Sequence, residues 1–205
     1  MTEVKYKLLK DYVPPIYRQQ SVLLEFFLNP EKTILKSKIL FSNDNGIPTD
    51  LILQGENIQL SYLKIDGKQI VLDHLTFMKH KLVIPKKFLG PRDFQVEMEN
   101  ILNPSTNKTL EGLYLSEGIL VTQCEPEGFR KICYSLDRPD VLSTYTVRIH
   151  GSYAHMLSNG NPVTISSNYS EWCDPFPKPS YLFALVAGDL AVSYTHLTLP
   201  TTAYV

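Results

Sequence analysis

Short runs in which apolar and polar residues alternate recur along the chain and predict β-strands. Residues 21–28 (SVLLEFFL) and 33–41 (TILKSKILF) are rich in strand-forming side chains, and in the second run Leu35, Ile39 and Phe41 share one face. Alternation with a period of two, with a Pro-containing turn between the runs, is typical of a hairpin. Further strands are expected at residues 51–53, 58–65, 69–72, 82–84, 94–101, 112–115, 119–123, 143–150 and within 163–172.

The segments between these runs contain turn-forming residues and no helical pattern. Asp66-Gly67 suits a two-residue hairpin turn, because both positions tolerate positive φ. No window places apolar residues at i, i+3, i+4 and i+7 between helix caps, so long amphipathic helices are not expected. The pattern therefore predicts an all-β fold.

Two consecutive segments near the end of the chain have distinct patterns. Residues 174–179 (DPFPKP) contain three prolines, which favour extended backbone over helix. Residues 181–187 (YLFALVA) form a continuous apolar run, which is typical of a strand buried on both faces.

Composition and charge exclude several classes of protein. The 205 residues are 43% hydrophobic and 20% charged, which is ordinary for a globular protein with one large domain or two small ones. The net charge of −1 argues against nucleic acid or an anionic membrane as the main partner. No apolar run approaches the roughly 20 residues of a membrane span, and residues 1–15 lack the apolar core of a signal peptide. The cytoplasm is the expected location.

The three cysteines do not form a recognisable metal or disulfide pattern. Cys124, Cys133 and Cys173 are an odd number, and no two of them form a C-x-x-C pair. Buried, unreactive thiols are the expected interpretation. Cys124 remains open, because it lies within the most polar stretch of the chain.

That stretch is residues 121–140 (VTQCEPEGFRKICYSLDRPD), where polar side chains are closely interspersed with apolar ones and with Gly and Pro. Gly permits positive φ and Pro fixes φ, so the backbone has an imposed shape. Such a segment either holds side chains toward a ligand or is a tight turn whose charges pair with one another. The residues concerned are Gln123, Glu125, Glu127, Arg130, Asp137, Arg138 and Asp140.

The order of these residues resembles the aminopeptidase N family of zinc-dependent gluzincin aminopeptidases, and in particular its bacterial branch. The shared strings are T-Q-C-E-x-E-G-F-R at residues 122–130 and Y-x-L-D-R-P-D-V at 134–141. The resemblance continues through LSNGN at 157–161 and DPFPKPSYLFALVAGDL at 174–190, and it includes residues 10–17 and 107–114. These strings cover most of residues 1–190 in the order of the family.

The resemblance implies an amino-terminal domain whose antiparallel sheets form a saddle-shaped, β-sandwich-like arrangement over residues 1–190. The family continues from this point toward a catalytic domain, whereas residues 191–205 (AVSYTHLTLPTTAYV) do not follow its pattern. We therefore expect residues 191–205 to be a foreign or read-through tail, and the chain to end before the catalytic domain.

The resemblance also implies a role in binding peptide amino termini. The Glu of the TQCE string, here Glu125, helps to hold the free α-amino group of the substrate, and Gln123 borders the pocket for the first side chain. Arg130, Asp137 and Arg138 are expected to brace the loop and the domain boundary. The zinc motif H-E-x-x-H and the G-A-M-E-N segment are absent from the sequence. We therefore expect zinc in the longer enzyme, no catalytic residue or metal ligand in this chain, and no peptide cleavage by this chain alone.

Two other classes of function remain open. A free-standing β-sandwich binding module would also have strands without a nucleophile or a metal motif. A structural domain whose polar loop contacts a partner is the other alternative. A gene that continues beyond residue 190 into the zinc motif would favour the enzyme over both.

Overall fold

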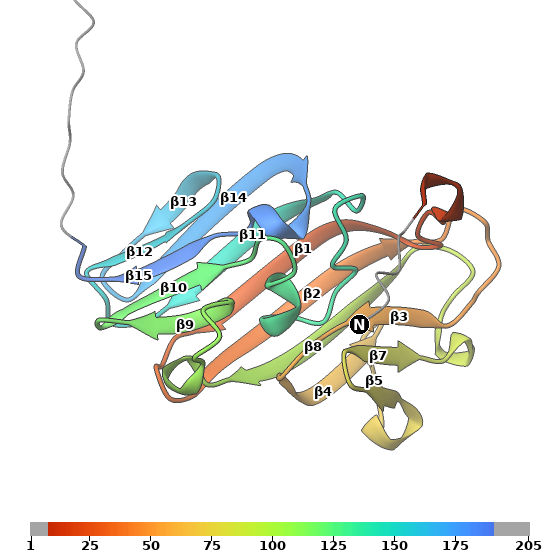
Figure 1. The fold of residues 1–205 in the computed structure, drawn as a ribbon, viewed down its shortest axis with the longest axis horizontal. Helices are drawn as coiled ribbons and strands as arrows, with labels where there is room; N and C mark the ends of the chain where they lie inside the picture. The colour runs from red at the N-terminus through yellow and green to blue at the C-terminus, as the bar shows by residue number, and fades with distance from the viewer. Residues whose placement is uncertain (1–7, 191–205) are drawn as a thin grey trace, which may run out of the picture.

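Eight strands form the main sheet of the computed structural model, which describes residues 8–190 (Figure 1). Their order across the sheet is β13-β14-β11-β1-β2-β8-β4-β5. Their bounds are Arg18–Phe27 for β1, Thr33–Ser42 for β2, Gln59–Ile65 for β4, Lys68–Ile70 for β5, Phe94–Leu102 for β8, Ser143–His150 for β11, Asn161–Ile165 for β13 and Tyr169–Lys178 for β14.

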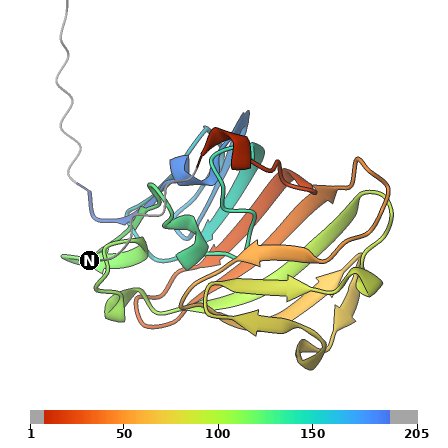
Figure 2. The same ribbon diagram turned by 45° about the vertical axis from the view of Figure 1, so that its right-hand side comes forward.

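Two smaller sheets lie over one face of the main sheet, one toward each end (Figures 1 and 2). One has the order β12-β15-β10-β9, with bounds His155–Ser158, Leu185–Gly188, Ile119–Gln123 and Gly112–Ser116. The other has the order β3-β7-β6, with bounds Leu51–Gln54, Lys81–Ile84 and Thr76–Met78. The expected all-β, sandwich-like fold is confirmed.

Helical structure within residues 8–190 is limited to six 3₁₀ turns of three residues each. The absence of long amphipathic helices from this part of the chain agrees with the sequence pattern. The turns are η1 (Leu9–Asp11), η2 (Leu72–His74), η3 (Lys86–Phe88), η4 (Pro104–Thr106), η5 (Phe129–Lys131) and η6 (Ser180–Leu182).

The core lies between the main sheet and the two smaller sheets. Strands β1, β2, β8 and β11 each present alternate apolar side chains to this interior, and the predicted face of Leu35, Ile39 and Phe41 is fully buried. The predicted β1–β2 hairpin is confirmed by its antiparallel register. The Asp66-Gly67 turn joins β4 to β5, and both of its residues have positive φ, at 49° and 78°.

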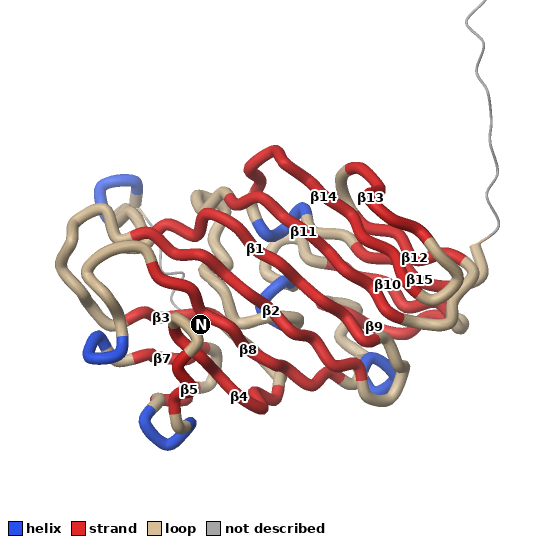
Figure 3. The backbone as a smooth tube through the Cα atoms, turned by 180° about the vertical axis from the view of Figure 1, so that it is seen from behind, coloured by secondary structure: helices blue, strands red, loops and turns tan. Residues whose placement is uncertain are grey.

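The opposite face of the main sheet is uncovered by any other element of residues 8–190 (Figure 3). Strand register places Glu171, Arg148, Glu25, Lys36 and Glu99 in one row across β14, β11, β1, β2 and β8, so the charges alternate in sign. We call these five residues the charged row. Arg148 Nη2 lies 3.5 Å from Glu171 Oε1, and Glu25 Oε1 lies 3.0 Å from Nε2 of the neighbouring His150. Opposite charges on adjacent strands are favourable neighbours in a sheet.

The centre of the main sheet contains a parallel pair. Strand β1 pairs with β11 in parallel, with Ser21 beside Thr144 and Phe27 beside His150. Within residues 8–190 the other strand pairs are antiparallel. The two halves of the chain therefore meet in the middle of the sheet.

The prediction of one buried strand over residues 181–187 is wrong. The run begins within the turn η6, and strand β15 starts only at Leu185. Phe183 and Leu185 are buried, whereas Leu182 is about half exposed, so the apolar run reflects a turn packed on the core and not a strand buried on both faces. The proposed tail at residues 191–205 lies outside the described residues.

Candidate functional site

The segment between β10 and β11 crosses the covered side of the main sheet, between the two smaller sheets (Figures 1 and 2). Its turn η5 begins at Phe129, whose fully buried ring lies edge-on to Phe183 and Tyr145, with ring centroids 5.4 and 6.2 Å apart. Aromatic packing of this kind stabilises an irregular segment that has few ladder hydrogen bonds. The segment is thus held firmly to the core at its middle.

A tight reverse turn precedes η5 and carries the two predicted site residues. The Gly128 N–H donates to the Cys124 carbonyl at 2.8 Å, and Gln123 Nε2 donates to the Glu125 carbonyl at 3.1 Å. The Glu125–Pro126 peptide bond is cis. A Cβ atom at Gly128 would lie 2.2 Å from the Gln123 carbonyl oxygen, so only glycine allows the backbone to approach itself this closely.

The carboxylate of Glu125 is exposed at the tip of this turn. Among residues 8–190 it has no hydrogen bond or ion pair. It borders a hollow of about 220 Å³ whose other lining residues are Pro126, Glu127, Asp137, Pro139 and Tyr181. An unpaired carboxylate beside a hollow with proline and tyrosine walls can accept hydrogen bonds from a cation.

Asp137 contrasts with Glu125, because its side chain is buried and each carboxylate oxygen has a partner. Oδ2 accepts from Arg130 Nε at 2.8 Å and from the Arg130 backbone N–H at 3.2 Å, and Oδ1 accepts from Ser180 Oγ at 2.5 Å. Arg130 also reaches the Asp137 carbonyl through Nη2 at 3.0 Å and Glu127 Oε2 through Nη1 at 2.9 Å. A buried carboxylate that binds a guanidinium through several bonds fixes the geometry of both groups.

The backbone of this region is anchored by two glutamines from distant strands. The Asp137 N–H donates to Gln54 Oε1 at 3.0 Å, and the Leu136 N–H donates to Gln19 Oε1 at 3.1 Å. Gln19 is itself buried and donates through Nε2 to Ser143 Oγ at 3.1 Å. Strands β1 and β3 therefore supply acceptors that the irregular segment cannot supply for itself.

Arg138 and Asp140 join the site to the segment before β1. Arg138 donates to both carboxylate oxygens of Asp140 at 2.8 and 2.6 Å, and its Nη2 also donates to the Val13 carbonyl at 3.0 Å. The Tyr12 hydroxyl donates to Asp140 at 2.9 Å. The hydrogen bonds from Arg138 hold the pKa of the Asp140 carboxyl below its usual range. The expectation that Arg130, Asp137 and Arg138 brace the loop agrees with these contacts.

The cysteines of the segment are buried thiols. Cys124 is 2% exposed and Cys133 is fully buried. Burial raises the pKa of the Cys124 thiol, and it raises the pKa of the Cys133 thiol to about 12. A thiol with a raised pKa is a poor nucleophile at neutral pH, so neither residue is an activated cysteine. The sequence did not decide whether Cys124 is a reactive thiol, and its burial and raised pKa are those of an unreactive one.

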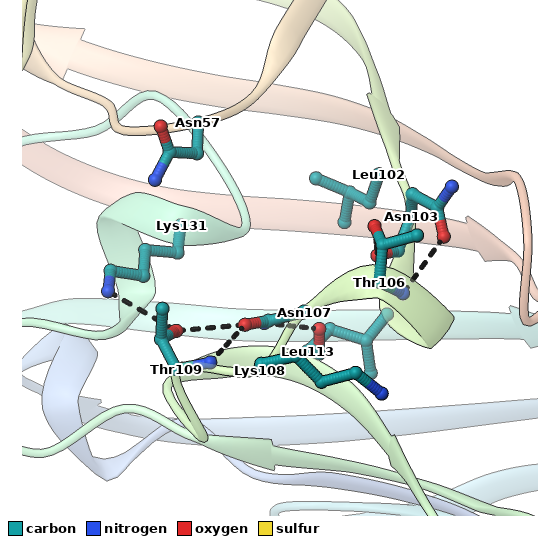
Figure 4. Close-up of a pocket in the computed structure, with 9 residues that line it drawn as sticks. All are labelled: Asn57, Leu102, Asn103, Thr106, Asn107, Lys108, Thr109, Leu113 and Lys131. Carbon is teal, nitrogen blue, oxygen red and sulfur yellow. Dashed lines mark hydrogen bonds between the residues drawn. The ribbon is translucent and has the colours of Figure 1, made fainter.

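A second hollow, of about 230 Å³, lies beside η4 and is lined by Asn57, Leu102, Asn103, Thr106, Asn107, Lys108, Thr109, Leu113 and Lys131 (Figure 4). Its central side chain, Asn107, donates through Nδ2 to the Glu111 and Leu113 carbonyls and accepts from Thr109. Lys131 Nζ lies 2.5 Å from Glu111 Oε2. Because these polar groups already bind one another, the hollow offers a ligand few free partners.

Two further properties concern the described residues alone. No group of three or more His, Cys, Asp or Glu side chains is placed to hold a metal ion within residues 8–190. The donor set of this part of the chain therefore does not fit a zinc site of three or four protein ligands. No helix in the same range is long and apolar enough to cross a membrane.

The structure places Gln123 at the end of β10 and Glu125 in the turn that follows, with a hydrogen bond from the Gln123 side chain to the Glu125 carbonyl. It adds Gln19, Gln54, Ser180 and Tyr181, which sequence reasoning missed. Ser180 and Tyr181 lie within the shared string at residues 174–190 and could have been suspected from it. Gln19 and Gln54 carry no local signal, because their side chains accept hydrogen bonds from residues 136 and 137, which lie far along the chain.

Comparison with known proteins identifies relatives of this fold and sequence. Residues 49–182 match the family model described as the Peptidase M1 N-terminal domain. The chain is 44% identical over 191 residues to aminopeptidase N of Caulobacter vibrioides, covering 90% of this chain and 22% of that protein. It is 38% identical over 201 residues to aminopeptidase N of Escherichia coli, covering 93% of this chain and 22% of that protein. The chain thus spans about a fifth of the length of these curated relatives.

Solved structures agree with this result. Aminopeptidase A of Legionella pneumophila in complex with aspartic acid superposes with a TM-score of 0.80 at 32% identity, over 90% of this chain and 23% of that one. An M1 zinc metallopeptidase from Deinococcus radiodurans has a TM-score of 0.72 at 16% identity, over 84% of this chain and 42% of that one, and supports the fold alone.

Proposed function

Because this chain belongs to the Peptidase M1 N-terminal domain family, we propose that it is the amino-terminal domain of a longer zinc-dependent aminopeptidase and that Glu125 binds the free α-amino group of the substrate. The observation that carries the proposal is the free carboxylate of Glu125 on a turn whose other charged groups are paired. The domain comprises residues 1–190, and the protein is proposed to act in the cytoplasm.

A carboxylate at this place can distinguish a peptide end from the interior of a peptide. A protonated α-amino group offers a positive charge and three donors, whereas an internal amide offers one neutral donor. A charge-assisted bond to a carboxylate is about twice as strong as a neutral one. Binding the amino terminus at a fixed point also sets the distance to the first peptide bond, which contributes the positioning part of catalysis.

Gln123 is proposed to border the space for the first side chain of the substrate. Its amide nitrogen donates to the Glu125 carbonyl, so its orientation is linked to that of the carboxylate-bearing residue. Its side chain is exposed on the same turn and therefore remains accessible to a bound peptide.

The remaining parts of the proposed enzyme lie outside this chain. The described residues do not provide a zinc ligand set, so zinc would be bound by the catalytic domain of the longer protein. When bound, zinc activates water and polarises the scissile carbonyl. We expect the isolated chain to show no aminopeptidase activity and to retain no stoichiometric zinc after dialysis. One tightly bound zinc ion per chain in a metal analysis would contradict this part of the proposal.

The proposal is tested in an active chimaera in which residues 1–190 replace the matching region of the Caulobacter vibrioides aminopeptidase N. A hydrogen bond to a charged group contributes about 1.5–3 kcal/mol, so Glu125→Ala should lower kcat/KM for free-amine peptides by about 10- to 100-fold. Glu125→Gln should recover little of this loss, because it keeps the shape and removes the charge.

Asp44→Ala is the control, since Asp44 is an exposed carboxylate that is already paired with Arg18 and lies outside the segment of residues 121–140. Its kcat/KM should change by less than about threefold, as expected for an exposed ion pair of about 0–1 kcal/mol. The already low rate on substrates with acetylated amino termini should change little in either variant. A folded Glu125→Ala enzyme with kcat/KM within twofold of the unmutated chimaera would refute the proposed role of Glu125.

A further inference from the structure

A continuous series of hydrogen bonds leads from the turn η6 to the turn that carries Glu125. Ser180 Oγ donates to Asp137 Oδ1, Arg130 Nε donates to Asp137 Oδ2, and Arg130 Nη1 donates to Glu127 Oε2. Glu127 lies two residues after Glu125 in the same reverse turn. The series therefore begins in the core and ends beside the free carboxylate.

The burial of the groups along this series decreases toward the turn. The side chain of Asp137 is 2% exposed, that of Arg130 is 15% exposed and that of Glu127 is 67% exposed. Because Asp137 is also fixed through its backbone to Gln54 and Arg130, it is the group with the least freedom to move. Arg130 links Asp137 to Glu127 on the turn. The turn has no strand pairing of its own between Cys124 and Gly128.

We propose that Asp137 is a positioning residue that acts through Arg130 to hold Glu125 where the substrate ammonium binds. The inference rests on the proposed function of Glu125 and adds the means by which that carboxylate is placed. Asp137 lines the same hollow as Glu125, but its oxygens are occupied by Arg130 and Ser180, so it is not itself the acceptor for the ammonium.

A second feature supports a positioning role over a general contribution to the fold. Arg130 binds Asp137 through the carboxylate and through the carbonyl, which fixes the plane of the guanidinium. The remaining nitrogen, Nη1, is then directed at Glu127. Only a planar group with several fixed donors can make this set of contacts, and a lysine at the same place cannot.

The test is a double-mutant cycle in the active chimaera. Asp137→Asn keeps the size of the side chain and removes the charge that orients Arg130, so kcat/KM should fall about tenfold through misplacement of Glu125. If Asp137 acts through Glu125, adding Asp137→Asn to Glu125→Ala should change kcat/KM by less than about twofold, because coupled residues are not additive.

Arg130→Lys is the second variant, because it keeps a cation beside the buried carboxylate and is a milder change if Asp137→Asn does not fold. We expect a loss of kcat/KM similar to that of Asp137→Asn, again absent when Glu125 is already Ala. Arg148→Lys on the uncovered face of the main sheet is the matched control, since it changes the same residue type in a pair with Glu171. It should change kcat/KM by less than about twofold in both backgrounds.

Four outcomes decide the inference. Losses that disappear in the Glu125→Ala background support positioning. Losses that multiply with that of Glu125→Ala show that Asp137 and Arg130 support the fold instead, while the role of Glu125 stands. Folded variants of Asp137 or Arg130 that keep kcat/KM within twofold of the unmutated chimaera also overturn it. If Glu125→Ala alone has no effect, the proposed function fails and the positioning role fails with it.

Discussion

Two regions of the molecule are rich in charged side chains and use them differently. On the uncovered face of the main sheet, strand register sets each member of the charged row beside a residue of opposite sign. In the segment of residues 123–140, Arg130 and Arg138 pair with Asp137 and Asp140 through fixed hydrogen bonds, and the Glu125 carboxylate has no partner among residues 8–190. The first region is regular and solvated, whereas the second is irregular and braced.

The difference shows how a protein can hold one carboxylate at a fixed position without pairing it. A sheet sets neighbouring side chains at a fixed spacing, so each carboxylate of the charged row lies beside a basic residue of the adjacent strand. An irregular segment has no such spacing, and each backbone group needs a partner from elsewhere. Gln19 and Gln54 supply acceptors for the backbone, and Ser180 supplies a donor for the Asp137 carboxylate. The Glu125 carboxylate is left available for a ligand.

The largest expected effect tests whether the braced region tolerates any added volume. Gly128→Ala would place a Cβ atom 2.2 Å from the Gln123 carbonyl oxygen and 2.9 Å from the Cys124 Cα atom. We expect the free energy of unfolding to fall by about 3 kcal/mol or more, because backbone atoms must move to relieve the overlap. Urea unfolding of the chain, followed by circular dichroism, measures this change.

Gly90→Ala is the control for this substitution. A Cβ atom at Gly90 has no heavy atom within 4 Å, apart from its chain neighbours, and its φ lies outside the positive range. The free energy of unfolding should stay within about 1 kcal/mol of that of the unmutated chain. Equal stability of the two variants would show that the turn at residues 123–128 can relax and is not rigid.

A smaller effect, dependent on pH, is expected where the braced region meets the segment before β1. The pKa of Asp140 is lowered by the hydrogen bonds from Arg138, so its ionised form stabilises the folded state above the unfolded pKa of about 4. That contribution is lost as pH falls through the folded-state pKa. Asp140→Asn should therefore lower Tm at pH 7, by the equivalent of less than about 1 kcal/mol for this solvent-accessible pair.

The pH profile distinguishes this pair from a general loss of packing. The difference in Tm between the unmutated chain and Asp140→Asn should narrow below pH 4, where Asp140 of the unmutated chain becomes protonated. A difference that stays constant from pH 7 to pH 3 would mean that the carboxylate charge contributes nothing to holding Arg138.

The smallest effect is expected in the charged row. Arg148 and Glu171 are 3.5 Å apart, and the Arg148 side chain is 40% exposed. A double-mutant cycle with Arg148→Ala and Glu171→Ala should give a coupling of about 0.2–1 kcal/mol, which decreases in about 1 M salt. A coupling above 2 kcal/mol would remove the contrast between the two regions.

The fold was largely predictable from sequence because its strands obey local rules. In β2 the apolar face of Leu35, Ile39 and Phe41 follows from the period of two, and Asp66-Gly67 specifies its own turn. Residues 181–187 were misassigned because a 3₁₀ turn packed on the core is as apolar as a buried strand. The parallel pairing of β1 with β11 could not be predicted either, since no local feature links positions so far apart in the chain.

The candidate site was predictable only in part. The resemblance directed attention to Gln123 and Glu125, and the structure places both on one turn, although their role in binding remains a proposal. The polar string also suggested that Arg130 and Asp137 brace the loop, but not which atoms they join. The partners Gln54 and Ser180 come from strand β3 and turn η6, and their positions depend on the finished tertiary structure.

The parallel pair at the centre of the main sheet has a consequence for synthesis on the ribosome. Strands β1, β2, β8, β4 and β5 lie within residues 18–102, so this half of the sheet is complete before β11 has been translated. Until residues 143–150 emerge, β1 is an edge strand whose backbone donors and acceptors have no ladder partner. Open edges with apolar side chains invite pairing with other chains. A nascent chain paused after β8 and before β11 has emerged would therefore be the species most in need of a chaperone.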